Sequence, residues 1–360
     1  MQTYPNTAPS LLFTDTEKED KPFAYLFISL LLIDIRSSIP SLLSKLNDPD
    51  YTKTSRRLAS AFDCIGVFIA YLVRCLEDDT LETFIMEPDS LLKIRKSISE
   101  TMSVTIEYLR DRWDASVAGA MGLHADARSN TTETSTGSHF TLTWDSIKNI
   151  AEEDPFILSA LQALALWLRE DENVQLRKEA TGLTDVFLDL YRASSSKKLD
   201  FRSAAVVAFE GLAALEKGRD AILRNEGWEL LSKDLVSSLQ AHKEVQSDRE
   251  AIHIIDIVRV LLAIAESERS GTLENWMDII TGVAAWDVPE TTSPVAQEAQ
   301  VAVLQLCCTL LAGTNTGMRI RYTHSIHAIA GIASQLNRTV SNEFREQMDD
   351  VLETLKTVSP

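Results

Sequence analysis

The sequence predicts an all-α protein, specifically a right-handed α-solenoid of armadillo- or HEAT-like helical repeats. Two segments, beginning at Ala160 and Ala208, run through the same order of residue types: a long helix, a turn, a small helix ending near glycine, and another long helix. No stretch shows sustained apolar–polar alternation or a hairpin turn, so a sheet is not expected. Because each repeat can bury its apolar face only against a neighbour, such periodicity predicts stacked helical layers.

The first third of the chain shows a helical pattern that is less regular. Residues 1–21 are polar and contain two prolines, so we expect disorder. Residues 23–35 are apolar nearly all round and predict a helix buried on several sides. Pro40 predicts a kink or a fresh start there. Further helices are expected at about 53–76 and from Asp89 to Val117, the latter with an apolar stripe at helical spacing: Ile94, Ile98, Met102, Ile106 and Leu109.

Residues 121–141 are rich in Gly, Ser and Thr and predict a flexible loop. This loop separates N-terminal helical repeats at 22–120 from C-terminal armadillo-like repeats at 142–360, within one continuous solenoid. Asp154 followed by Pro155 is typical of a helix start. From there, helices are expected at about 155–169, 173–181, 183–193, 201–215, 217–225, 227–240, 247–267, 271–285, 294–313, 315–322, 323–336 and 341–357.

The formal net charge is −18, and the acidic excess is spread evenly. Residues 1–180 hold 18 basic and 28 acidic side chains, and residues 181–360 hold 17 and 25. A negative field repels phosphate backbones, so nucleic acid is not an expected partner. A solvated acidic surface is the simpler interpretation, and a docking face for a basic partner is the alternative.

The cysteines and the apolar runs indicate a cytoplasmic protein. Cys64, Cys75, Cys307 and Cys308 lie in apolar helical patterns without metal or redox spacing, which is typical of reduced, buried thiols. The N-terminus has no signal-peptide pattern. The run 23–33 is too short to cross a bilayer, and the run 58–73 contains an aspartate. No membrane span is therefore expected.

Candidate catalytic and metal-binding residues each have a simpler structural interpretation. His324 and His327 could share a helix face and bind a metal, but no Cys or Glu stands at ligand spacing, so an exposed or capping pair is favoured. His253 is expected to be a hydrogen-bonded core histidine. Two acidic groups, 152–154 and 170–172, fall in breaks between helices, where a cap and a solvated turn explain them better than catalysis does.

Phosphate-binding glycine loops and nucleophile elbows are absent from the sequence. Most tryptophans (Trp113, Trp167, Trp228, Trp276 and Trp286) are expected to pack between repeats, whereas Trp144 could anchor the flexible loop. The basic residues Lys93, Arg95, Lys96, Arg110 and Arg112 are interpreted as ion pairs along a solvated helix rather than as an anion site. We therefore expect no catalytic, cofactor-binding or metal-binding residue, and no enzymatic activity.

Several segments resemble the neurochondrin family, particularly its fungal members. They are residues 31–43, 57–63, 107–119, 142–146 and 163–180, and the most specific are Arg110–Asp114 and Trp167–Asn173. The resemblance implies an armadillo-like, non-enzymatic cytosolic protein, whose animal members act in neurite outgrowth, signalling and small-GTPase-dependent trafficking. Family members usually carry further N-terminal repeats. If such repeats are missing here, and not replaced by residues 1–21, the exposed face of the helix at 23–35 should be apolar and prone to association.

These observations favour a protein-binding scaffold or adaptor that takes up partner proteins in a solenoid groove, in signalling or vesicle trafficking. Basic segments and small-GTPase pathway proteins are the expected partners; which residues bind them is not defined by the sequence. The alternative is an assembly chaperone or transport adaptor for a basic client. An enzyme of unfamiliar type is a further alternative, and it would require an enclosed pocket with titratable side chains.

Overall fold

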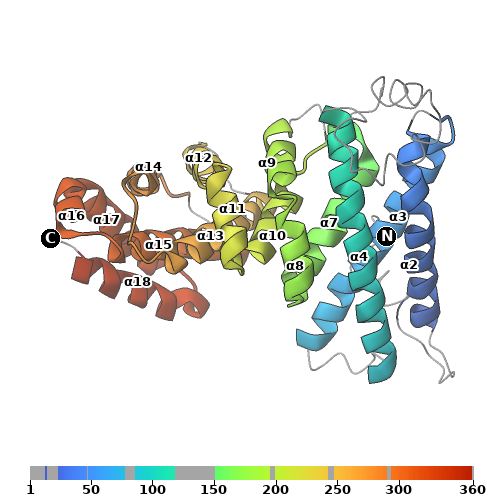
Figure 1. Cartoon of the computed structure of the whole chain (residues 1–360). Coiled ribbons are helices and arrows are strands. Elements are labelled where there is room, and N and C mark those ends of the chain that lie inside the picture. The colour runs from blue at the N-terminus through green and yellow to red at the C-terminus, as the bar shows by residue number, and fades with distance from the viewer. Residues whose placement is uncertain are drawn as a thin grey trace. The chain divides into compact units, whose positions relative to one another are not determined.

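The computed structural model describes residue 13 and residues 23–46, 48–77, 86–117, 151–194, 199–241, 247–289 and 293–358 (Figure 1). All regular secondary structure in these ranges is helical, and none of it is strand. The all-α prediction is therefore confirmed. The chain divides into two compact units, Met1–Lys217 and Gly218–Pro360. The segments 1–21, apart from Phe13, and 121–141, together with Trp144, lie outside the described residues, so the expected disorder and loop stay predictions.

The first unit contains three long helices followed by shorter ones. The elements are α2 (Phe23–Leu42), η1 (Leu43–Lys45), α3 (Tyr51–Glu77), α4 (Pro88–Val117), η3 (Ala151–Glu153), α7 (Pro155–Glu170), α8 (Val174–Thr181), α9 (Thr184–Ala193) and α10 (Arg202–Ala213). Helix α7 packs extensively against α3 on one side and against α10 on the other. Helix α2 packs mainly on α4 and also on α3, while α8 packs on α4.

Helix α2 continues through Pro40 to Leu42, so the expected fresh start at this point is wrong, whereas the expected kink stays a prediction. Proline removes one backbone donor and crowds the preceding turn. Pro40 lacks the amide that would donate to the Arg36 carbonyl, and the helix nevertheless continues to Leu42. Ile39 and Leu42 on either side are buried, and their packing holds the last turn in helical form.

The apolar stripe expected on α4 is confirmed. Its five side chains are all buried: Ile94, Ile98, Met102, Ile106 and Leu109. Two buried threonines of α4 satisfy their hydroxyl groups within the helix. The Thr101 hydroxyl donates to the Ser97 carbonyl, and the Thr105 hydroxyl donates to the Thr101 carbonyl. A helix with one apolar stripe is positioned by burying that stripe against its neighbours.

The long–short–long order of the first predicted repeat is present in α7, α8 and α9. Asp154 caps α7, with its side chain accepting from the Phe156 amide and Pro155 at the first helical position, as the sequence predicts. Asn173 caps α8 by accepting from the amides of Gln175 and Leu176. Caps of this kind satisfy amides that the helix leaves without an internal partner.

The remaining helices form the second unit, with α11 (Glu216–Arg224) spanning the boundary between the units. They are α12 (Gly227–Gln240), α13 (Asp248–Ser267), η4 (Glu274–Trp276), α14 (Met277–Ala284), α15 (Pro294–Ala312), α16 (Thr316–Arg321), α17 (Thr323–Thr339), η5 (Asn342–Phe344) and α18 (Arg345–Val358). The order of α15, α16 and α17 is again long, short, long. The expected helices at 271–285 and 341–357 each begin instead as a 3-10 turn.

The helices of the second unit pack in two rows. One row runs α12, α14, α17, and the other runs α13, α15, α18. The rows meet through α12 and α13, through α14 and α15, and through α17 and α18. Within the first row, Trp228 stacks on Trp276 with ring centroids 4.0 Å apart, and both rings are buried. Apolar faces turned toward the other row supply the core of this unit.

Two helical glycines in the first unit provide a test of the packing between α7 and α10. A Cβ atom on Gly211 of α10 would lie 2.7 Å from the Leu168 carbonyl oxygen of α7, whereas a Cβ on Gly66 of α3 would meet nothing within 4 Å. We expect Gly211→Ala to lower the free energy of unfolding by about 1–3 kcal/mol, because the two backbones would have to separate.

Gly66→Ala is the matched control, and we expect it to be neutral or stabilising by up to about 1 kcal/mol, since alanine favours a helix interior. Urea denaturation of both variants measures the difference. Equal effects of the two substitutions would show that α7 and α10 do not approach each other as described.

Candidate functional site

A seam of polar contacts ties α4 to the segment 171–185 in the first unit. Arg95 pairs with Asp171, Ser103 donates to Glu179, and Arg110 lies 3.6 Å from Asp185. The sequence separations are 76, 76 and 75 residues, respectively. A near-constant separation means that α4 and this segment advance side by side in the same direction. The seam therefore fixes the register of one helical layer against the next.

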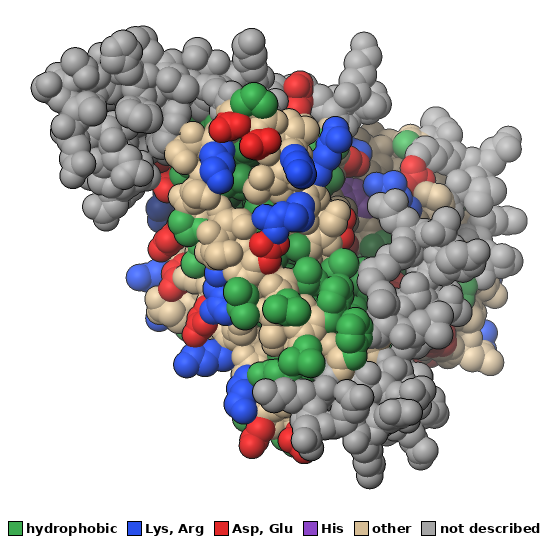
Figure 2. All heavy atoms as spheres, turned by 90° about the vertical axis from the view of Figure 1, so that its right-hand side faces the viewer, with side chains coloured by type: hydrophobic (Ala, Val, Ile, Leu, Met, Phe, Trp, Pro, Cys, Tyr) green, Lys and Arg blue, Asp and Glu red, His purple; other side chains and the backbone are tan. Residues whose placement is uncertain are grey.

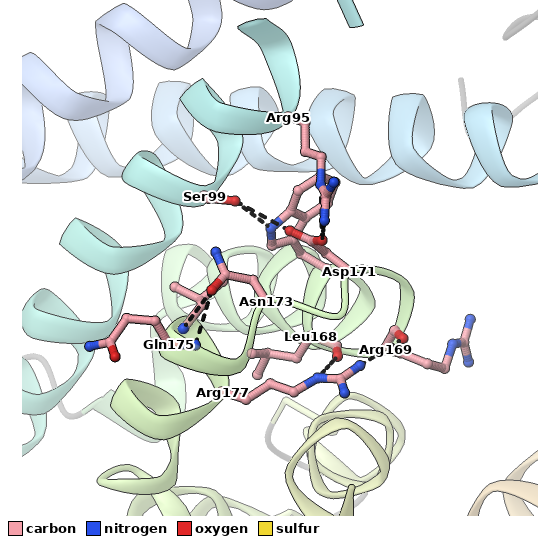
Figure 3. A network of polar contacts seen from close by, with 10 residues as sticks. Arg95, Ser99, Leu168, Arg169, Asp171, Asn173, Gln175 and Arg177 are labelled. Atoms are coloured by element: carbon pink, nitrogen blue, oxygen red, sulfur yellow. Dashed lines mark hydrogen bonds and ion pairs between the residues drawn. The ribbon is translucent and has the colours of Figure 1, made fainter. Parts of the chain in front are cut away.

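Asp171 is the centre of the seam, and Figure 3 shows its surroundings. Its carboxylate accepts from Arg95 Nε at 3.1 Å and Nη2 at 2.6 Å, and from Ser99 Oγ at 3.3 Å. The indole Nε1 of Trp167 in turn donates to Ser99 Oγ. Because Asp171 is buried while its charge is met by a guanidinium and a hydroxyl, the carboxylate is stabilised in the folded chain. Both oxygens of the Asp171 carboxylate are thus engaged in structural hydrogen bonds.

The rest of the same segment organises the break between α7 and α8. Arg177 Nε donates to the Leu168 carbonyl at 3.0 Å, and its Nη2 donates to the Arg169 carbonyl, so Arg177 satisfies the C-terminal end of α7 (Figure 3). Asn173 caps the start of α8. Arg169 pairs with Glu170. The stretch Trp167–Asn173, which carries much of the family resemblance, is thus explained by structural contacts between described residues.

A second polar cluster lies in the core where α3, α4 and the start of α7 meet. The Tyr51 hydroxyl donates to Asp154 Oδ2, and Tyr108 and Arg112 are close enough to act electrostatically on Tyr51. All four side chains are buried. Burial, followed by the negative charge of Asp154, raises the pKa of Tyr51 to about 12. Burial is also the main cause that raises the pKa of Tyr108 well above its usual value.

The interpretation of the basic residues of α4 as ion pairs along a solvated helix is wrong for Arg112, which is fully buried. Arg95 and Arg110 do form ion pairs, but their partners lie outside α4, at Asp171 and Asp185. Lys96 makes an expected pair within the helix, with Glu100 at 3.9 Å. Sequence reasoning missed Arg112 because the nearby acidic residues Asp111 and Asp114 suggested a solvated helix face. Its helical position, four residues after the buried Tyr108, was the available signal.

His324 and His327 lie where their simpler interpretation placed them, whereas His253 is hydrogen-bonded as expected but is not fully in the core. His324 and His327 are exposed on α17. His253 is half-buried, and its Nε2 lies 3.1 Å from Asp234 Oδ2. Among the described ranges, no three His, Cys, Asp or Glu side chains gather in a way that could hold a metal ion.

Four of the five tryptophans expected in the core are buried. Trp167, Trp228, Trp276 and Trp286 are buried, and Trp113 is half-buried. Glu172 is exposed, as expected for a solvated turn, whereas its neighbour Asp171 is buried.

The four cysteines are free thiols. Cys307 and Cys308 are buried on α15, and burial raises the pKa of Cys308 to about 12 and that of Cys307 further. Cys64 and Cys75 are half-buried on α3. Raised pKa values suppress the thiolate form, so Cys307 and Cys308 have the properties of packing residues rather than nucleophiles.

Exposed side chains mark two surfaces that could meet a partner. In the first unit, an apolar stripe runs along α2, and Figure 2 shows apolar side chains gathered on the side of the molecule where α2 lies. In the second unit, the row α12, α14, α17 exposes a face that is mostly polar or small, here called the row face. It comprises Glu229, Lys233, Ser237, Glu274, Asp278, Thr281, His327, Ala328, Gly331 and Gln335.

The helices of the row face begin at one edge. Asn275 donates to Glu229 Oε1 at 3.1 Å, which joins the starts of α12 and α14. Arg321, just before α17, pairs with Glu274. Acidic side chains therefore concentrate along this edge, at Glu229, Glu274 and Asp278, and only Arg321 is paired with one of them by a described salt bridge. Equivalent helices that begin side by side are typical of a repeat array.

Fold and surfaces together define an all-helical protein whose helices pack in rows, and sequence comparisons identify its family. A model of the Neurochondrin family matches residues 2–312. The chain belongs to the Neurochondrin family. An uncharacterised protein of the fission yeast Schizosaccharomyces pombe is 26% identical over 215 residues, which are 59% of this chain and 33% of the yeast protein. This chain thus covers about a third of that relative. No solved structure matches at a significant level.

Three described helical segments are long and apolar enough to cross a membrane by length and composition alone. They are Phe23–Lys45, Tyr51–Cys75 and Pro294–Ala312. In the last of these, 67% of the apolar window is buried inside the protein, compared with 33% in the first. The expectation that no segment spans a membrane stays a prediction.

Removing the Asp171 carboxylate tests the seam. We expect Asp171→Ala to lower the free energy of unfolding by about 1–3 kcal/mol, because it deletes a buried acceptor that receives three hydrogen bonds. Asp189→Ala is the control, since Asp189 makes an exposed pair with Arg192 within one helix and should change stability by less than about 0.5 kcal/mol. Urea denaturation that found the two variants equal would contradict a stabilising seam.

The tyrosine cluster predicts a loss of stability at alkaline pH. In the unfolded chain Tyr51 ionises near pH 10, whereas in the folded chain it keeps its proton to about pH 12. Between these values the unfolded state binds fewer protons, so the free energy of unfolding falls as pH rises. The contribution is fully present below pH 10 and decreases by about 2 kcal/mol by pH 12.

We expect Tyr51→Phe to show a shallower decrease in the free energy of unfolding over this pH range, measured by urea denaturation at fixed pH. A slope equal to that of the unaltered protein would remove Tyr51 from this explanation.

Proposed function

We propose that this chain is a non-enzymatic scaffold or adaptor that binds partner proteins, and that its helices form a right-handed, armadillo-like solenoid. The observation that supports this most is the row face, where three successive helices of the second unit expose a polar surface and begin at one edge. Stacked repeats of this kind present extended surfaces that bind protein segments with little rearrangement.

The charge of the row face favours a basic partner segment. Glu229 and Asp278 are exposed at its edge, where Glu274 already pairs with Arg321, and the whole chain carries a net charge of −18. Complementary charge accelerates encounter and selects among partners more than it adds affinity. The short side chains of Ser237, Thr281, Ala328 and Gly331 leave room for an extended segment to approach the helices. A basic segment of a signalling or trafficking protein fits this surface.

A cytoplasmic location is part of the same proposal. It is supported by the four free thiols, two of them deeply buried, because such thiols are typical of proteins kept in a reducing compartment.

Charge reversal on the row face tests the proposed binding mode. The probe is a short peptide rich in Lys and Arg, with an uncharged peptide of equal length as the reference, and binding is measured by fluorescence anisotropy at low and high salt. We expect the double variant Glu229→Lys, Asp278→Lys to weaken binding at low salt at least about fivefold, because two attractive charges become repulsive.

The matched control is Asp350→Lys with Glu353→Lys, which makes the same change in net charge on α18, in the other row. Equal weakening by both double variants would assign the effect to overall charge, and binding that does not respond to salt would contradict the electrostatic mode. Affinity purification of the full chain with identification of the bound proteins then tests whether natural partners respond in the same way.

A further inference from the structure

An apolar stripe on α2 is exposed in the first unit. Its members are Phe23, Leu26, Leu30 and Ile33, with 52%, 44%, 65% and 55% of their surfaces exposed. The opposite face of α2 is buried and packs on α3 and α4. Figure 2 shows apolar side chains gathered on this side of the molecule. Contiguous exposed apolar surface of this kind marks an interaction site more often than isolated apolar residues do.

The spacing of the stripe fits one helix rather than a broad surface. Its members follow one another at intervals of three, four and three residues, which is the spacing of the seam in a two-stranded helical packing. Such a seam receives one partner helix at a small crossing angle. A partner without a helical apolar stripe of the same spacing would leave part of the exposed stripe on α2 uncovered.

The spacing also reads the same in both directions. When α2 of a second copy lies antiparallel, Phe23 falls opposite Ile33 of that copy and Leu26 falls opposite Leu30, so every member of the stripe meets another member. A two-fold interface requires this self-complementarity. We propose that the α2 stripe is a self-association surface, through which two copies of this chain pair antiparallel.

Charge supports a second copy as the occupant. No residue from Phe23 to Ile33 is charged. The charged residues that follow, Asp34 and Arg36, already pair within the unit with Arg57 and Glu100. Two copies therefore meet at this stripe without opposing like charges, although each chain carries −18 overall. The uncharged α2 stripe offers no attraction to the basic segments that the row face favours, so the two surfaces have different partners.

A membrane is the competing occupant, and the packing of α2 disfavours it. Only a stripe of the helix is exposed, because Ala24, Ile28, Leu32, Ile35 and Ile39 are buried within the unit. A helix that lies on a membrane usually exposes a wide apolar face flanked by Lys and Arg. A spanning α2 would have to leave α3 and α4 and carry Asp34 and Arg36 into hydrocarbon.

Sedimentation velocity of the full chain at increasing concentration tests the proposal. Since the α2 stripe is short, we expect a weak dimer with a Kd on the order of 10 µM. Leu30→Asp places like charges between the two α2 stripes and should weaken the dimer at least about tenfold. Ile320→Asp is the matched control, because Ile320 is 63% exposed and lies in the second unit; it should leave the dimer unchanged.

Disulfide crosslinking tests the antiparallel register. A mixture of Leu26→Cys and Leu30→Cys chains should crosslink to each other faster than either variant crosslinks to itself. The proposal would be overturned if the chain were monomeric at 100 µM, or if each cysteine variant crosslinked only to copies of itself. Equal effects of Leu30→Asp and Ile320→Asp would also overturn it. So would binding of the monomeric chain to phosphatidylcholine–phosphatidylserine vesicles that Leu30→Asp abolishes. None of these results affects peptide binding at the row face.

Discussion

The structure depends on helices that each bury one apolar face against a neighbouring layer. In the second unit this burial takes place between the rows α12, α14, α17 and α13, α15, α18. In the first unit it places α7 between α3 and α10. The hydrophobic effect drives such burial, and it acts along the whole length of each helix. Close approach makes it specific: Gly211 lets the backbones of α10 and α7 come together where any larger side chain would separate them.

Polar contacts then set the register that burial alone leaves undefined. An apolar stripe can slide along its neighbour at modest cost, but Arg95 must meet Asp171 and Ser103 must meet Glu179. Asp171 lies in Trp167–Asn173, one of the two segments in which the family resemblance is most specific. The same logic holds at the starts of α12, α14 and α17, where Asn275 meets Glu229 and Arg321 meets Glu274. Polar residues are thus used at layer edges to fix the relative position of the helices.

The sequence predicted much of this fold because the relevant signals are local. Capping by Asp154, the stripe on α4 and the long–short–long order from 155 onward all follow from residues close together in the chain. Long-range contacts were not predictable in this way. Asp171 and Glu172 look alike in sequence, yet only Asp171 meets an arginine 76 residues away. Arg112 and the continuation of α2 through Pro40 were misjudged because their neighbours in space, and not in sequence, decide them.

The surfaces were the least predictable part. The α2 stripe has a clear spacing, but whether it faces a neighbour or solvent depends on which side α3 and α4 cover. The row face has no periodic signal of its own, because it consists of the positions left over when each apolar face is buried. A surface defined in this way has no sequence motif, so the proposed binding of partners there has no signal in the sequence.

Amide hydrogen exchange tests the central role of burial between layers most directly. If layered burial holds each unit together, the slowest exchange falls in helices packed between two others, namely α7 in the first unit and α15 in the second. The fastest exchange among the helices of the second unit falls in α16, which contains no buried residue. Slow exchange in α16, or protection in α7 and α15 no greater than in the short helices, would contradict it.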